Sequence, residues 1–329
     1  MKLFAATLVA SALLMNAAHA APTLDAPARG EIIAALVRQL DAYYVDPTEA
    51  TLMGQALRAK QQHGDYDNID EAKAFADVLT ADLRAVSHDK HLRVGAAANP
   101  QPPMPASGGP TPEQKAAMLK QVTARNFGIA KVETLEGNIG YLDLRGFDPT
   151  EFAAPAITAA MTQLAGSAAL IIDLRQNGGG DPAGVAFLSG YLFDQRTHLN
   201  DLYWREGDRT QEFWTDPSVP GTRYGQARPV YVLTGPRTFS GGEEFAYDMQ
   251  QLKRATLVGA TTGGGANPGR IRMLTPYFGA FIPNGRPINP VSKTNWEGTG
   301  VVPEIMVPVE EALATAHKLA LARVGGAAR

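Results

Sequence analysis

The sequence contains no cysteine in its 329 residues. This absence excludes a disulfide framework, a lipid-anchored cysteine and a cysteine nucleophile. Any covalent catalysis by this chain must therefore use another side chain, such as a serine hydroxyl.

The chain also lacks an excess of charge of either sign. It has 30 Lys and Arg against 33 Asp and Glu, a formal net charge of −3, and no basic run. No electrostatic footprint for nucleic acid or for an anionic membrane is present. A hydrophobic content of 45% with 19% charged residues is ordinary for a globular protein, and the length suits about two domains.

Long hydrophobic runs are missing except at the start, MKLFAATLVASALLMNAAHA. Lys2 is followed by an apolar stretch, 3–15, and then by the small-x-small sequence Ala18-His19-Ala20. This order predicts a signal peptide over 1–20 and a bacterial periplasmic or secreted protein that begins at Ala21. A membrane anchor is the alternative, but spanning needs about 20 apolar residues and this stretch is shorter. No later segment is apolar enough to be expected to span a membrane.

The pattern of apolar residues and prolines divides the mature chain into three parts. A helical apolar period over 31–86 predicts an N-terminal helical domain, 21–94. The segment 95–112 holds six prolines in eighteen residues and predicts a linker. Short β-rich runs then alternate with helical stretches, which predicts an α/β core over 113–329.

Two local signals in the core concern its turns. Asn284-Gly285 lies between two β-like runs and predicts a two-residue hairpin. Ser240 and Glu243 in TFSGGEEFAY have the spacing of a capping box. A serine between a strand and a helix, followed by two glycines, is also typical of a nucleophile, and the local sequence leaves both interpretations open.

The remaining candidate groups are glycine runs and histidines. The runs 173–184 and 259–269 follow strands but lack a P-loop ending, so they are either tight turns or donors for an oxyanion. His88, Asp89 and His91 permit a metal site, but a metal needs three or four ligands and no further cluster is visible. We expect neither a metal nor another cofactor.

Six separated motifs resemble one family, the C-terminal processing (tail-specific) serine peptidases, in the branch that includes tricorn protease and interphotoreceptor retinoid-binding protein. They are SHDKHLRV, GNIGYLDLRGF, LIIDLRQNGGGDPAG, VYVLTGPRTFSGGEEFAY, VGATTGGGANPG and NWEGTGVVPEI. The resemblance implies a crotonase-like ββα core. Only 31 residues separate Val94 from Asn126, fewer than the ~50 of a domain, so the chain resembles the branch without a PDZ module.

The resemblance also implies roles for individual residues. Ser240 falls at the family's nucleophile, and the lysine of the Ser/Lys branch falls at Gly265, so that dyad is absent. His91, in a D-x-H motif, corresponds to the base of the other branch, and Glu297 corresponds to its orienting acid. Lys90 stands where the tricorn-like pattern has a serine.

The oxyanion hole implied by the resemblance is the N–H of Gly241 with that of Gly179 or Gly180. The expected function is hydrolysis of protein or peptide substrates through a Ser240 acyl-enzyme. Two alternatives are a weak or inactive binding protein for hydrophobic ligands and acyl chemistry on a small molecule. The sequence does not determine the oligomeric state.

Overall fold

The computed structural model describes residues 24–101 and 110–327 of the chain. The expected signal peptide and part of the expected linker therefore lie outside the described residues. Within the described ranges, no helix is both long and apolar enough to span a bilayer.

Three helices form the N-terminal part, α1 (Ala26–Tyr43), α2 (Pro47–His63) and α3 (Ala72–Ser87). Each begins where an acidic side chain, from Asp25, Asp46 or Glu71, accepts the free N–H groups of the first turn. The apolar stripes predicted from the sequence, including Leu36 and Phe75, are buried between the helices. The prediction of a helical region is confirmed for its described residues.

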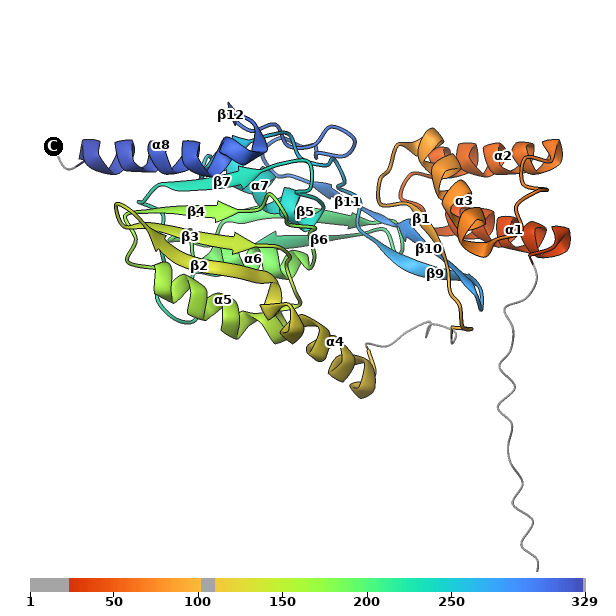
Figure 1. Cartoon of the computed structure of the whole chain (residues 1–329), viewed down its shortest axis with the longest axis horizontal. Helices are drawn as coiled ribbons and strands as arrows, with labels where there is room; N and C mark the ends of the chain where they lie inside the picture. Colours follow the sequence, from red (N-terminus) through yellow and green to blue (C-terminus); the bar gives the residue numbers. More distant parts are fainter. Residues whose placement is uncertain (1–23, 102–109, 328–329) are drawn as a thin grey trace, which may run out of the picture.

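The core of this helical part also contains side chains from the far end of the chain. Phe278, Ala280 and Ile282 belong to the same buried cluster as the helix residues. They come from β10 (Phe278–Pro283), which pairs antiparallel with β1 (Arg93–Ala96) and with β9 (Gly269–Thr275). This three-stranded sheet joins the helical part to the rest of the molecule (Figure 1). β1 also extends past residue 94 into the segment predicted as linker.

The main sheet has six strands in the order β12-β8-β7-β4-β3-β2. Its strands are β2 (Ile129–Leu135), β3 (Ile139–Leu144), β4 (Ala169–Asp173), β7 (Val230–Thr234), β8 (Thr256–Gly259) and β12 (Ile305–Met306). β2 is antiparallel to β3, and every other pair is parallel. β4 and β7 are buried at every position, as central parallel strands are when both faces are covered.

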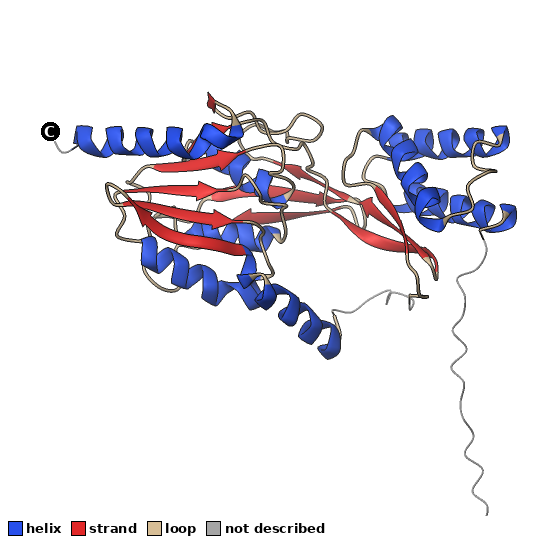
Figure 2. Ribbon diagram, viewed as in Figure 1, coloured by secondary structure: helices blue, strands red, loops and turns tan. Residues whose placement is uncertain are grey.

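Helices cover both faces of this sheet (Figure 2). Residues of α5 (Thr150–Leu164), α6 (Pro182–Gly190) and α7 (Gly241–Gln251) pack on one face, with alternate strand residues such as Ile172. Ala312, Ala316 and Ala320 of α8 (Ala312–Ala327) pack on the other. The predicted mixed α/β core is therefore confirmed, whereas its narrower crotonase-like type stays a prediction.

The predicted hairpin at Asn284-Gly285 is wrong. β10, before it, pairs with β9 and β1, whereas β11 (Gly285–Ile288), after it, pairs with β5 (His198–Trp204). β5 also pairs with β6 (Arg209–Trp214), which completes a second three-stranded sheet. The chain thus changes sheets at this turn, because long-range partners compete successfully with the local pairing. Helix α4 (Pro112–Ala124), which precedes β2, has a capping box and buries only Val122.

Candidate active site

Ser240 occupies a strained turn between β7 and α7. Its φ of 52° and ψ of −122° lie in a region that residues with a side chain rarely adopt. The Ser240 N–H donates to the Glu243 carboxylate at 2.9 Å, and the N–H groups of Glu243 and Glu244 donate to the Ser240 carbonyl. The oxygens of Ser240 act only as acceptors in this cap, so the hydroxyl proton remains available for other chemistry.

Two glycines pack directly against this turn. A Cβ on Gly179 would lie 2.7 Å from the Ser240 Cβ, and one on Gly241 would lie 3.1 Å from the nitrogen of Gly180. Gly179 and Gly180 have φ values of 98° and 141°, which only glycine adopts readily. Backbone can approach the serine this closely because no side chain intervenes.

The hydrogen bonds distinguish the two oxyanion donors that the sequence left open. The Gly179 N–H already donates to the Asn177 side chain at 2.8 Å. Within the described ranges, the N–H groups of Gly180 and Gly241 have no acceptor. Two free and adjacent N–H groups beside a serine are the arrangement that an oxyanion hole requires. The geometry therefore favours Gly180 over Gly179.

His91 lies beside the serine's turn although it comes from the loop after α3. Its ring centroid is 4.6 Å from that of Phe239, the residue before Ser240, and 6.0 Å from that of Phe281 on β10. No hydrogen bond joins the Ser240 hydroxyl to His91 within the described residues. Catalytic hydrogen bonds are often long without substrate and tighten in the complex.

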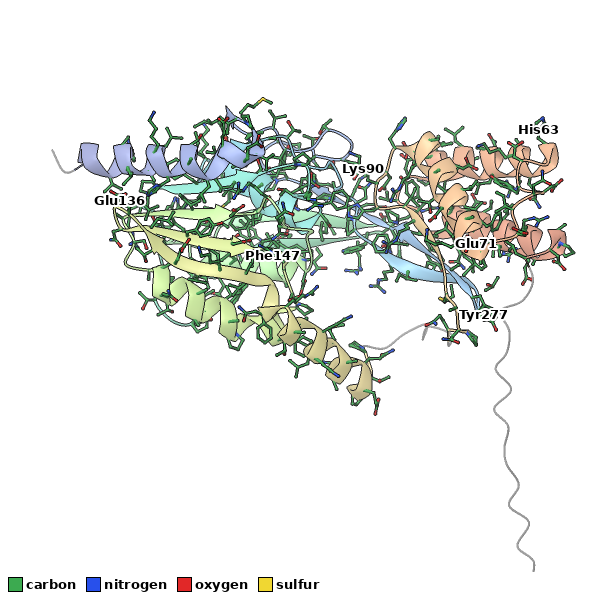
Figure 3. The ribbon with its side chains drawn as sticks, viewed as in Figure 1. His63, Glu71, Lys90, Glu136, Phe147 and Tyr277 are labelled. Carbon is green, nitrogen blue, oxygen red and sulfur yellow. The ribbon has the colours of Figure 1, made fainter. Side chains whose placement is uncertain are left out.

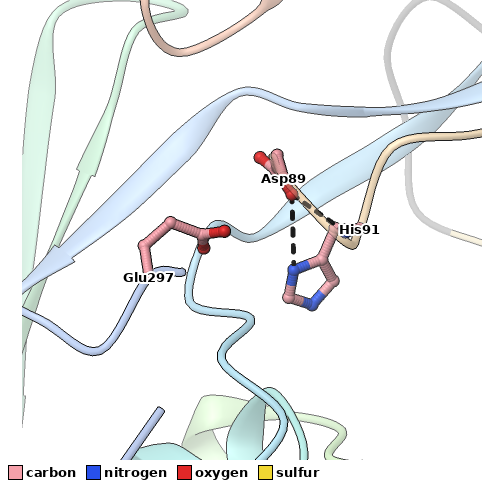
Figure 4. A group of neighbouring side chains, drawn as sticks. All are labelled: Asp89, His91 and Glu297. Carbon is pink, nitrogen blue, oxygen red and sulfur yellow. Dashed lines mark hydrogen bonds and ion pairs between the residues drawn. The ribbon is translucent and has the colours of Figure 1, made fainter. Parts of the chain in front are cut away.

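Two carboxylates face His91, one of which the sequence did not single out for a catalytic role. Asp89, 1% exposed, accepts the His91 backbone N–H and lies 3.9 Å from the ring nitrogen Nδ1. Oxygens of Asp89 and Glu297 and a nitrogen of His91 all lie within 4.8 Å of one another. Figure 4 shows the imidazole with Nδ1 toward the carboxylates and Nε2 pointing away from them.

His91 and Glu297 each carry a buried polar atom that has no hydrogen-bond partner among the described residues. These atoms are Nδ1 of His91 and Oε1 of Glu297. The other oxygen, Oε2, accepts the N–H groups of Ala266 and Asn267 at 2.5 and 3.0 Å. A bond from Nδ1–H to Oε1 would satisfy both orphaned atoms and would fix the tautomer of the imidazole.

Burial is the largest cause of the pKa shifts of His91 and Glu297. Burial lowers the pKa of His91 below 6.5, against the opposing charge of Asp89. Burial and the Asp89 charge raise the pKa of Glu297 to about 7, although the two backbone N–H bonds lower it. The three side chains also offer a set of ligand atoms for a divalent cation. Asp89 and Oε2 of Glu297 already accept hydrogen bonds, however, from Tyr44, Asn267 and the backbone.

The glycine-rich segment 262–267 lies between the turn of Ser240 and His91. The contacts that hold it there were not predicted from the sequence. Besides the Ser240 N–H, the buried Glu243 carboxylate accepts the Thr262 hydroxyl and the N–H groups of Gly264 and Gly265, at 2.5, 2.6 and 2.9 Å. Glu297 holds the next two residues of the same segment. The S-x-x-E spacing identified Glu243 as a cap but gave no sign of these distant contacts.

Lys90 adds a further link to this segment. Its ammonium donates to the Gly263 carbonyl at 2.5 Å, across 173 positions of sequence. Lys90 lies where the helical part meets the core (Figure 3). Lys90, which stands where the tricorn-like pattern has a serine, therefore connects the loop of His91 to the core by a hydrogen bond.

Comparisons with known proteins identify the class. The model of peptidase family S41 matches residues 138–307, and the model of the N-terminal domain of this family in eukaryotic interphotoreceptor retinoid-binding protein matches 13–130. The chain belongs to peptidase family S41, which supports the assignment as a serine peptidase.

Solved structures agree in fold. The photosystem II D1 C-terminal processing protease is 18% identical, with a TM-score of 0.52 over 86% of this chain and 93% of its own. A putative peptidase from Parabacteroides merdae is 18% identical, with a TM-score of 0.61 over 89% of this chain and 96% of its own. Tricorn protease is 11% identical, with 0.58 over 92% of this chain and 37% of its own.

Proposed function

We propose that this protein is an exported serine peptidase that hydrolyses peptide bonds of proteins or peptides through an acyl-enzyme on Ser240. The observation that carries the proposal is the packing of the glycine-rich segment, described above, which brings a strained serine, two free N–H groups and a histidine–carboxylate pair to one place. Membership of family S41 supports the peptidase class. A crotonase-like core and export through the leader are parts of the same proposal.

The reaction follows from the positions of these groups. Nε2 of neutral His91 accepts the Ser240 proton while Oγ attacks the substrate carbonyl. The N–H groups of Gly180 and Gly241 bind the tetrahedral oxyanion, and the Glu297 carboxylate stabilises the imidazolium. The imidazolium then protonates the departing amine, and water hydrolyses the ester by the same route.

The lysine alternative conflicts with the space around Gly265. A Cβ there would lie 2.2 Å from the Phe239 ring and 2.9 Å from Cε1 of His91. A side chain at this position has no room, because the imidazole and the phenyl ring fill the space that a dyad lysine would need. This observation favours His91 as the base.

Fluorophosphonate labelling tests the proposal, because the probe reacts only with an activated hydroxyl. We expect one adduct on Ser240, located by mass spectrometry, and loss of labelling in His91→Ala. Absence of any adduct, together with saturable binding of hydrophobic ligands, would instead support the binding-protein alternative. Amino-terminal sequencing of exported protein tests the leader, and we expect Ala21.

A further inference from the structure

A groove with a glycine floor lies on one face of the β1–β10–β9 sheet. Gly95 and Gly279 are cross-strand partners and form the floor. Ile271, Met273 and Phe281 are wall residues of the same groove, as is Tyr277, and its volume is about 370 Å³. The opposite face of the sheet, with Val94 and Ala280, is buried against the helices. No atom of the described residues 24–101 and 110–327 lies within 4 Å of the Cβ position of Gly95, so none of them fills the floor there.

One wall residue of this groove, Phe281, contacts the proposed base. Phe281, which lines the groove, stacks on the His91 ring with an angle of 27° between planes. The same imidazole contacts Phe239, next to Ser240. His91 therefore connects the nucleophile's turn to the groove, whereas the oxyanion glycines contact Ser240 directly.

The chemistry of the histidine indicates which part of a substrate reaches the groove. The imidazolium gives its proton to the leaving amine, and the residues C-terminal to the scissile bond depart with that amine. A surface reached through the histidine therefore receives the leaving side. We propose that this groove binds a bulky apolar side chain of the residue immediately C-terminal to the scissile bond of an extended peptide. This inference rests on the proposed peptidase function.

The walls of the groove explain the preference for an apolar side chain. Ile271 is 51% exposed and would be covered by a bound leucine or phenylalanine. Among the described lining residues, Arg93 alone carries a charge, so a lysine would meet an unfavourable cation. Apolar pockets discriminate by roughly tenfold or more for a side chain of this size.

Decapeptides that differ only in this residue, as Leu, Gln, Glu or Lys, test the inference, with cleavage positions read by mass spectrometry. We expect kcat/KM to be about tenfold higher for Leu than for Gln, and lower still for Lys. Gly95→Val fills the groove without a steric conflict in β1, so it should remove this preference. Gly166→Val is the matched control, because its Cβ position is equally open but lies outside the groove. Ile271→Lys should reverse the order and favour Glu.

Hydrolysis of an N-acetyl amino-acid methyl ester distinguishes a failure of the groove from a failure of the peptidase function, because its leaving group is methanol, which is too small to fill the groove. Gly95→Val should lower the ratio of Leu-peptide to ester turnover, whereas Gly166→Val should not. If the rate of peptide cleavage did not depend on the varied residue, or did not change in Gly95→Val, the proposed role of the groove would be wrong. The proposed peptidase function would be unaffected. Failure to cleave any peptide or ester, or to react with a fluorophosphonate, would overturn both.

Discussion

Gly265 lies against His91, with its Cβ position 2.9 Å from Cε1 of the imidazole. This contact bears on the choice of base, because the position at which the resemblance places the lysine of the Ser/Lys branch lies directly against the proposed base, His91. The two arrangements are mutually exclusive in this chain, since Phe239 occupies the rest of the space.

Gly265→Lys should therefore inactivate the protein rather than supply a new base. The added side chain must displace His91 or Phe239, and overpacking of this kind costs about 1–3 kcal/mol of stability. We expect peptide turnover to fall at least a hundredfold, with Gly166→Lys as the control at an open position. A Gly265→Lys protein with wild-type turnover would show that the site admits this side chain beside His91 and would contradict the steric argument.

Substitutions of Ser240 distinguish its role at the start of α7 from its proposed role as the nucleophile. Because the cap uses the Ser240 backbone and the Glu243 carboxylate, Ser240→Ala and Ser240→Asn should unfold within about 1 kcal/mol of wild type. Both should lose on the order of 10³-fold in turnover, because neither has a hydroxyl. Thermal unfolding and peptide turnover are measured on the same samples. A Ser240→Asn protein that cleaves normally would leave Ser240 as a structural residue only.

The pH dependence should reflect Glu297 more than His91. Burial lowers the pKa of His91, so the neutral base is available at pH values below 6.5. Burial and Asp89 raise the pKa of Glu297 to about 7, so its carboxylate, which stabilises the imidazolium, forms only as pH rises through about 7. We expect kcat/KM to rise through about pH 7 in wild type. In Glu297→Gln the rise should move below 6.5 and reach a lower plateau, whereas an unchanged midpoint would exclude this role.

A buried acidic pair on α7 should make stability fall as pH rises. Glu244 and Asp248 are 5% and 0% exposed, and their described neighbours are Asn200, Asn289 and, at longer range, Asp181. Burial raises the pKa of Glu244 to about 7 and that of Asp248 well above its ordinary value. A raised folded-state pKa means that stability is full below about 4.5 and is lost as pH rises through about 7.

Urea unfolding at several pH values measures this effect. The free energy of unfolding should be a few kcal/mol lower at pH 8 than at pH 5, and Glu244→Gln should reduce the difference. Glu310→Gln changes an exposed acid and should leave the difference unchanged. If the free energy of unfolding of wild type were the same at pH 5 and pH 8, burial of Glu244 and Asp248 would not lower stability as pH rises, and the prediction would be wrong.

The sequence by itself determined the layers and the candidate nucleophile. The helical apolar period over 31–86 and the alternation of strands and helices after 113 are local patterns, and the structure contains both. Ser240, His91 and Glu297 could be selected because the motifs that contain them resemble those of one peptidase family and occur in the same order. Local turn signals were less reliable, as Asn284-Gly285 shows. The strand that pairs with a given strand is selected from the whole chain, so distant segments can replace the neighbour across a turn.

Only the tertiary structure decided how these residues meet. The positions of Lys90 on Gly263 and of the Glu243 carboxylate on the segment 262–267 depend on contacts across 173 and 21 positions of sequence. The preference for Gly180 over Gly179 as the proposed oxyanion donor depends on the Asn177 side chain, which already accepts the Gly179 N–H. Residue identity fixes which groups can donate, accept or titrate. Which of them are buried, paired or left free is a property of packing, and that property decides where catalysis can occur.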